Sequence, residues 1–218
     1  MDGLLFRSLK SQQLPVLRIY GWKYPTVSAG NIQSVSTIKA LIGNINVPYY
    51  VRRDSSGGCY YHYDEIMVCF ISDKKTLSYT GKNSPLLKFS NAIKKTLQTY
   101  GISAQRQSSS HGNKNTAKFS PFQRSDYDLF DPQYKPLAVI SDKVSRTRYL
   151  IHSSVVPQRL TEYSRILEVE PHEFVTGFCN KLSQFMVELY KLPGSKDWKY
   201  TENMKQKALQ NADQYLLR

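Results

Sequence analysis

The sequence predicts a single α+β domain, in which a mixed or antiparallel sheet has helices packed on it. Strand-like runs are mixed with segregated helical segments, no internal repeat is present, and the 218-residue chain is 40% hydrophobic. This length and composition are sufficient for one large core. We assign residues 1–195 to the main domain, and we expect residues 196–218 to add a C-terminal helix packed on the same domain.

Runs rich in β-branched and aromatic residues, bounded by turn-forming residues, predict the strands. The predicted strands are Leu14–Trp22, Asn46–Arg53, Ile66–Ser72, Tyr127–Phe130, Leu137–Ser141 and Thr147–Val156. Between the second and the third of them, the stretch Arg52–His62 is expected to form a short strand, a turn and a second strand.

Apolar residues at helical spacing predict the helices. The clearest helix covers Ser84–Tyr100, since Ser84 can cap it, a proline fits its first turn and a glycine follows its end. A short helix is expected at Ser34–Ile42, and a last one at Thr201–Leu217. Another helix begins at Pro171, ends before Pro193 and Gly194, and carries one apolar face made of Phe174, Phe178, Leu182, Phe185 and Leu189.

Charge and cysteine content narrow the class of protein. The formal net charge is +13 and the isoelectric point is about 9.6, which favours acidic partners. Three cysteines at irregular spacing fit neither a disulfide framework nor a zinc site. The sequence contains no apolar run of about 18 residues. We therefore expect a soluble protein of a reducing compartment, cytoplasmic or mitochondrial, that binds neither a membrane nor a metal through its own residues.

The stretch Arg52–His62 is the most informative segment of the chain. It reads Arg-Arg-Asp-Ser-Ser-Gly-Gly-Cys-Tyr-Tyr-His. Adjacent glycines let backbone N–H groups approach a ligand, and guanidinium groups match carboxylate or phosphate oxygens. The segment therefore suits a carboxylate or nucleotide site. The alternative is an ordinary hairpin in which the Ser-Gly-Gly turn only supplies positive φ angles.

Several segments, taken in order, resemble the lipoate-protein ligase A family of the biotin/lipoate ligase and octanoyltransferase fold group. Trp22–Gln33 is similar to the family's Trp-x-x-Pro-x-x-x-x-Gly-x-x-Gln segment, and Arg52–His62 to its Arg-Arg-x-Ser-Gly-Gly-Gly-Ala-Val-x-His loop. Weaker similarities lie in Met1–Leu5, Phe119–Leu129 and Lys143–Val155. The resemblance implies a catalytic domain like those of biotin ligases and class II aminoacyl-tRNA synthetases.

The resemblance also implies a reaction. Enzymes of this type use ATP and Mg²⁺ to convert lipoate or octanoate to an acyl-adenylate, and they pass the acyl group to a lysine of a small carrier domain. An acidic lipoyl domain, from a 2-oxoacid dehydrogenase E2 or the glycine-cleavage H protein, is then the expected partner, and nucleic acid is not. By position, the residues that bind the acid and the adenylate are Arg53, Ser55, Ser56, Gly57, Gly58, His62 and Asp128, with support from Gly30 and Gln33.

The segment that carries the family's catalytic lysine differs in this chain. This Gly-x-Lys-hydrophobic-Ser-Gly-Ser-Ala segment corresponds to Gln133–Ser141, in which Lys135 matches after one inserted residue and the glycines are gone. We predict that Lys135 is catalytic, with Lys143 as a poorer substitute and an exposed turn lysine as the alternative. Three other functions stay open: an ATP-independent octanoyltransferase, a biotin ligase-like relative, and an inactive basic binding protein of the same fold. Cys59 is expected to be a packing residue rather than a nucleophile.

Overall fold

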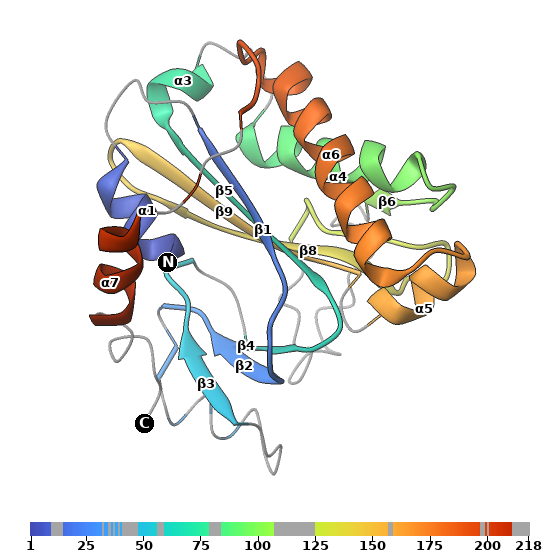
Figure 1. The fold of residues 1–218 in the computed structure, drawn as a ribbon, viewed down its shortest axis with the longest axis horizontal. Helices are drawn as coiled ribbons and strands as arrows, with labels where there is room; N and C mark the ends of the chain where they lie inside the picture. Colours follow the sequence, from blue (N-terminus) through green and yellow to red (C-terminus); the bar gives the residue numbers. More distant parts are fainter. Residues whose placement is uncertain are drawn as a thin grey trace.

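The protein consists of two β-sheets and helices that cover the larger sheet (Figure 1). Its computed structural model describes residues 1–9, 15–31, 33–34, 36, 38, 40, 48–55, 59–78, 84–106, 125–156, 159–196, 199 and 201–210. The predicted helix at 34–42 and the end of the predicted C-terminal helix lie largely outside these residues. No helix within them is long and apolar enough to cross a membrane.

The larger sheet is antiparallel throughout and contains the longest strands. Its order is β1 (Val16–Tyr20), β5 (Ile66–Asp73), β9 (Arg148–Val155), β8 (Pro136–Val144), β7 (Leu129–Phe130) and β6 (Gln105–Arg106). Strand β5 lies inside the sheet and is buried along its whole length. Alternate β5 residues therefore face opposite sides of the sheet.

The smaller sheet holds the segment that the sequence singles out. Its order is β3 (Tyr49–Arg52), β2 (Thr26–Ala29) and β4 (Cys59–His62). Strand β2 pairs parallel with β3 and antiparallel with β4. Because β3 and β4 lie on either side of β2, the ordinary-hairpin alternative is wrong.

Two long helices cover one face of the larger sheet. Helix α4 (Pro85–Gln98) begins at Ser84, whose hydroxyl accepts a hydrogen bond from the backbone N–H of Leu87 at 3.2 Å, as the sequence predicts. Helix α6 (Pro171–Tyr190) packs against α4. The buried stripe of α6 consists of Phe174, Phe178, Leu182, Met186 and Tyr190. The predicted face was wrong at its end, where Phe185 and Leu189 are only partly buried, because an i, i+4 spacing continues through Met186.

The opposite face of the sheet carries the N-terminal helix. Helix α1 (Asp2–Ser8) buries Leu5 and Phe6 against Cys69 and Ile71 of β5. Helix α7 (Glu202–Gln210) lies beside α1 in Figure 1, and its Met204 packs against the same cluster. Short helices α3 (Lys74–Ser78) and α5 (Leu160–Ile166) follow β5 and β9. The α+β prediction is therefore confirmed, whereas β2 and α5 are elements that the sequence analysis missed.

Candidate active site

A small cavity lies where β4 faces strands β5, β8 and β9 of the larger sheet. It is lined by Arg53, Tyr60, His62, Met67, Val139, Ser141, His152, Ser153 and Ser154. Its volume of about 20 Å³ is enough for a water molecule and too small for an acyl chain. Arg53 and His62, from the ends of the predicted loop, thus share this cavity with residues from the distant strand β9.

A chain of hydrogen bonds runs behind one wall of the cavity. The Arg53 guanidinium donates from Nη1 to the hydroxyl of Ser28, and this hydroxyl contacts Nε2 of His62. Nδ1 of His62 lies 2.5 Å from Oε1 of Glu65, whose other oxygen accepts from the Ser154 hydroxyl. All five side chains are buried. The chain links a guanidinium to a carboxylate through a serine and a histidine.

Burial decides the charge of this histidine. His62 is 2% exposed and stacks on the Trp22 ring, with the ring centroids 4.8 Å apart. Burial lowers the pKa of His62, and the hydrogen bond and charge of Glu65 offset only part of that effect. The imidazole is therefore neutral at physiological pH. Burial likewise lowers the pKa of Arg53, to about 10, so that its guanidinium stays charged.

A second chain of polar contacts lies behind the opposite wall. His152 on β9 places Nδ1 3.0 Å from the hydroxyl of Ser55 and Nε2 3.1 Å from Oδ2 of Asp2. Ser141 on β8 donates its hydroxyl to Ser55 at 3.2 Å. The N-terminal helix thus supplies a carboxylate to the site, and Ser55 joins the predicted loop to the larger sheet.

Asp2 is held as a carboxylate in spite of its burial. Burial acts to raise the pKa of Asp2, but the hydrogen bond and charge of His152 and the charge of Arg18 outweigh it. The Arg18 guanidinium lies 2.6 Å from Oδ1, and Tyr20 donates its hydroxyl to Oδ2 at 2.9 Å. The pKa of Asp2 therefore lies well below its ordinary value of 3.8.

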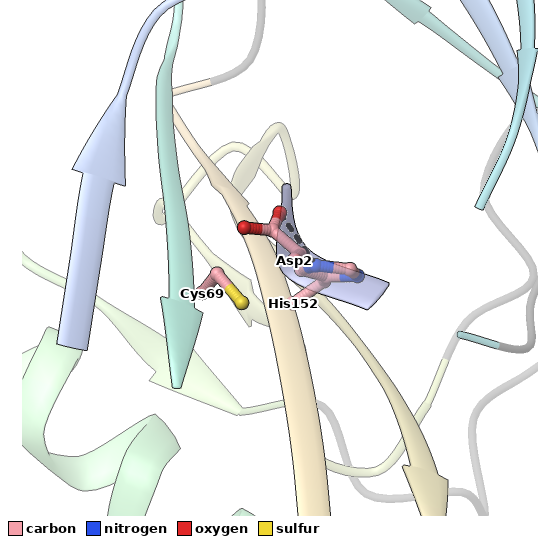
Figure 2. Close-up of side chains that lie close together, drawn as sticks. All are labelled: Asp2, Cys69 and His152. Carbon is pink, nitrogen blue, oxygen red and sulfur yellow. Dashed lines mark hydrogen bonds and ion pairs between the residues drawn. The ribbon is translucent and has the colours of Figure 1, made fainter. Parts of the chain in front are cut away.

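Asp2, Cys69 and His152 form a cluster of possible metal ligands. Figure 2 shows the carboxylate and the imidazole joined by a dashed line, with the thiol nearby, and their ligand atoms lie within 4.8 Å of one another. Burial raises the pKa of Cys69 well above its ordinary value, so a thiol and not a thiolate is present. Arg18 already neutralises the carboxylate. These charges favour an ion pair over a bound metal ion.

The two predicted residues near β7 lie elsewhere. Asp128 is 1% exposed, and its oxygens accept from the backbone N–H groups of Ser125 and Ile140 at 2.9 and 2.8 Å. Lys135 is exposed in a turn whose backbone is held by Asp131. Its position is about 13 Å along the chain from Val139, the first β8 residue of the cavity wall. Neither residue lines the cavity.

Lys143 lies much closer to the predicted loop. It shares a face of β8 with Val139 and Ser141, because side chains alternate along a strand. Its ammonium lies 3.2 Å from Oδ1 of Asp54, which Arg7 also approaches at 3.5 Å. Two cations therefore meet beside the residue that precedes Ser55, a composition suited to polyphosphate oxygens.

The predicted supporting residues form a turn clamped by Arg52. Its Nη1 donates to the carbonyl oxygens of Gly30, Asn31 and Gln33 at 3.2, 3.1 and 2.7 Å. The thiol of Cys59 lies 3.5 Å from the side-chain oxygen of Gln33, and burial raises its pKa, as expected of a packing residue. The predicted ligand-binding residues Ser56, Gly57 and Gly58 lie outside the described residues.

Comparison with known proteins identifies the family. A family model of the lipoyl protein ligase A/B catalytic domain matches residues 1–207. The chain belongs to this family. The resemblance drawn from the sequence is thereby confirmed. A search of curated proteins finds no match.

Solved structures of this family share the fold. Ta0514 from T. acidophilum, solved with bound lipoic acid, has a TM-score of 0.69 at 18% identity, over 98% of this chain and 87% of that one. A lipoate-protein ligase A bound with ATP has a TM-score of 0.65 at 17% identity, over 97% and 87%. A bi-partite lipoate protein ligase of Thermoplasma acidophilum, studied with its E2 lipoyl domain, has a TM-score of 0.60 at 15% identity, over 97% and 85%.

Sequence analysis missed several polar residues of this site. It overlooked the carboxylates of Glu65 and Asp2 and their partners Ser154 and His152. It also overlooked Ser28, whose hydroxyl lies between Arg53 and His62. The one available signal was the position of Glu65, which directly precedes an eight-residue strand buried throughout. A carboxylate at such a position needs a partner in the folded protein.

Proposed function

We propose that the protein is a lipoate-protein ligase that activates lipoate or octanoate with ATP and transfers the acyl group to a lysine of a carrier domain. The observation that carries this proposal is the buried, charged guanidinium of Arg53 at the wall of a cavity, beside the family's loop. The relatives solved with lipoic acid and with ATP support the choice of substrates.

The proposed reaction has two steps. A carboxylate oxygen of the acid attacks the α-phosphorus of ATP, and pyrophosphate leaves. The neutral amine of the carrier lysine then attacks the acyl carbonyl carbon, AMP leaves with the bonding electron pair, and the amine releases one proton to solvent. Arg53 would hold the carboxylate oxygens through charge-assisted hydrogen bonds, which strengthen as charge builds up on the transferring group.

Lys143 is better placed than Lys135 to act on the phosphates. Lys143 and Arg7 lie beside the loop at Asp54, whereas Lys135 is exposed at the far end of β8. We therefore assign the phosphate-binding cation to Lys143, and the prediction for Lys135 remains to be tested against it. Mg²⁺ bound with ATP would add charge neutralisation on the phosphates.

The cavity must open to admit an acyl chain. Tyr60 closes one side, and the Arg53 guanidinium carbon lies 4.4 Å from the centre of its ring. A shift of this ring would widen the cavity on that side. The chain's net charge of +13 would then attract an acidic lipoyl domain to the opening. The relative studied with an E2 lipoyl domain supports this partner.

The test is pyrophosphate release from ATP in the presence of octanoate or lipoate, followed by the mass increase of an acidic lipoyl domain. Arg53→Gln should lower release about a hundredfold, the size of effect expected from losing one transition-state donor. Arg146→Gln, an exposed arginine of the β8–β9 connection, is the matched control. Circular dichroism would verify that both variants fold.

A second pair of variants decides between the lysines. Lys143→Gln should lower release strongly, and Lys135→Gln should leave it near the wild-type rate; the reverse result restores the prediction for Lys135. Acyl transfer from octanoyl carrier protein without pyrophosphate release identifies an octanoyltransferase instead. Salt-sensitive binding to random DNA without either activity identifies an inactive basic binding protein.

A further inference from the structure

Donor and acceptor chemistry gives the hydrogen-bond chain behind Arg53 a direction when His62 is neutral. Guanidinium N–H groups can only donate, so the Ser28 hydroxyl accepts from Arg53 and must turn its own proton toward Nε2 of His62. His62 then donates from Nδ1 to Glu65, which also accepts from Ser154. The chain therefore places the proton of the neutral imidazole on Nδ1.

The positively charged groups around the imidazole favour the same state, and the carboxylate of Glu65 opposes it only in part. Glu65 faces Nδ1 from the start of β5, Arg53 approaches from the end of β3, and His152 faces it from β9. The aromatic rings of Trp22 and Tyr60 also lie beside His62. A proton added to Nε2 places an imidazolium and a guanidinium on the same serine oxygen, in a buried site where their repulsion is poorly screened.

The hydrogen-bond chain also connects two buried side chains of opposite charge. Arg53 and Glu65 are 9% and 5% exposed, and each loses most of its hydration on folding. The two neutral residues between them provide hydrogen bonds to both. Removing the hydroxyl of Ser28 deprives the guanidinium of a hydrogen-bond acceptor and the imidazole of a hydrogen-bond donor. The substitution leaves the backbone of β2 unchanged.

We propose that Ser28 and Glu65 are positioning residues, which fix His62 as the Nδ1–H tautomer and thereby hold the Arg53 guanidinium at the cavity wall for a carboxylate ligand. The role of Arg53 toward the acid rests on the proposed function. The tautomer of His62 does not depend on the proposed function, so an experiment can contradict one of these two claims and leave the other standing. Ser154 completes the chain by satisfying the second oxygen of Glu65.

Nitrogen-15 NMR of the histidine side chains tests the state of His62, and isothermal titration with octanoate tests Arg53. In the wild type, we expect Nδ1 of His62 to be protonated and Nε2 to be unprotonated at neutral pH. Ser28→Ala removes the donor to the neutral form, so His62 should titrate at higher pH. Glu65→Gln removes the nearby negative charge, so His62 should titrate at lower pH. A disturbance that is only structural has no reason to shift the two variants in opposite directions.

Octanoate affinity should fall about tenfold in Ser28→Ala, as expected when a charged group loses one hydrogen bond, and Ser28→Thr should restore most of it. Ser164→Ala is the control, because Ser164 is 2% exposed and its hydroxyl has no hydrogen-bond partner among the described residues. His62 titration in Ser28→Ala that matches the Ser164→Ala control overturns the proposal. So does unchanged octanoate affinity. A wild type that binds no acid instead contradicts the proposed function, while the titrations still decide the state of His62.

Discussion

Asp128 offers the sharpest test of a role that sequence resemblance and structure assign differently. The resemblance predicts that it binds the ligand, yet its carboxylate is 1% exposed and accepts hydrogen bonds from Ser125 and Ile140 among the described residues. Two come from the backbone N–H and the hydroxyl of Ser125, and one from the backbone N–H of Ile140. The geometry therefore predicts that Asp128 fixes the entry into β7 against β8.

The substitution Asp128→Asn keeps the shape of the side chain and replaces one oxygen with an amide nitrogen. If the remaining oxygen takes the position of Oδ1, the amide NH₂ group faces the backbone N–H of Ser125, and that hydrogen bond is lost. The two hydrogen bonds to Oδ1 remain, but they become weaker because the acceptor is no longer charged. A hydrogen bond to a charged group contributes about 1.5–3 kcal/mol, so we expect a loss of about 2–4 kcal/mol in unfolding free energy. For a domain of this size, the melting temperature should fall by about 5–15 °C.

Urea unfolding followed by circular dichroism measures this loss. Asp126→Asn is the matched control, since Asp126 is exposed two residues away and should change stability by less than about 0.5 kcal/mol. Wild-type stability of Asp128→Asn, together with lost octanoate activation, refutes the structural assignment. That result returns Asp128 to the ligand-binding residues.

Three further predictions concern stability. The pKa of His62 lies below its ordinary 6.5 and that of Asp2 below its ordinary 3.8, so the unfolded chain binds more protons than the folded protein below these values. The free energy of unfolding, measured with urea at a series of pH values, should therefore fall as the pH decreases below 6.5 and again below 3.8. Tyr190→Phe removes the hydrogen bond from Tyr190 to the Pro85 carbonyl, 2.6 Å long, and calorimetry should show a loss of about 1 kcal/mol. Phe178→Ala, at a fully buried position, should lower the free energy of unfolding by about 3–5 kcal/mol, as measured with urea. A smaller loss means that α4 and α6 move together and fill the space that the phenyl ring leaves.

The parts of the fold that sequence could predict are those coded by local signals. Helix α4 has a capping serine, a proline in its first turn and an apolar stripe, all within the helix itself. Strand β2 has no comparable signal, because its four residues include the buried hydroxyls of Thr26 and Ser28. The Thr26 hydroxyl donates to the nearby Tyr24 carbonyl. The Ser28 hydroxyl, in contrast, is explained only by Arg53 and His62, which folding brings to it.

The same distinction holds for the site. Arg53 and His62 could be found because both belong to one loop with a recognisable spacing. Their buried partners could not, since Ser154 is 89 residues from Glu65, and Asp2 is 150 residues from His152. Residues so far apart in the sequence form no local pattern. From the sequence alone, an aspartate such as Asp2 is expected to be exposed. The family's loop therefore points to the candidate site, and the tertiary structure shows which charged groups surround it.

The cavity wall contains many polar residues and nevertheless suits an apolar ligand. Both nitrogens of His62 and both of His152 are engaged with serines and carboxylates, and Ser141 and Ser154 donate their hydroxyls within the same networks. Their polar atoms are therefore satisfied by one another, and a ligand that enters need not remove them from water. Met67 and Val139 complete the wall.

An acyl chain that extends along this wall should gain affinity with every added methylene. Burying one CH₂ contributes about 0.8 kcal/mol, which corresponds to about a fourfold gain in affinity. We expect isothermal titration with fatty acids from butanoate to octanoate to show such a series, and Val139→Ser should flatten it by making the wall polar. An affinity that is independent of the length of the fatty acid contradicts this prediction. It means that Arg53 binds the carboxylate while the acyl tail stays in water, and that the cavity binds a different, shorter acid.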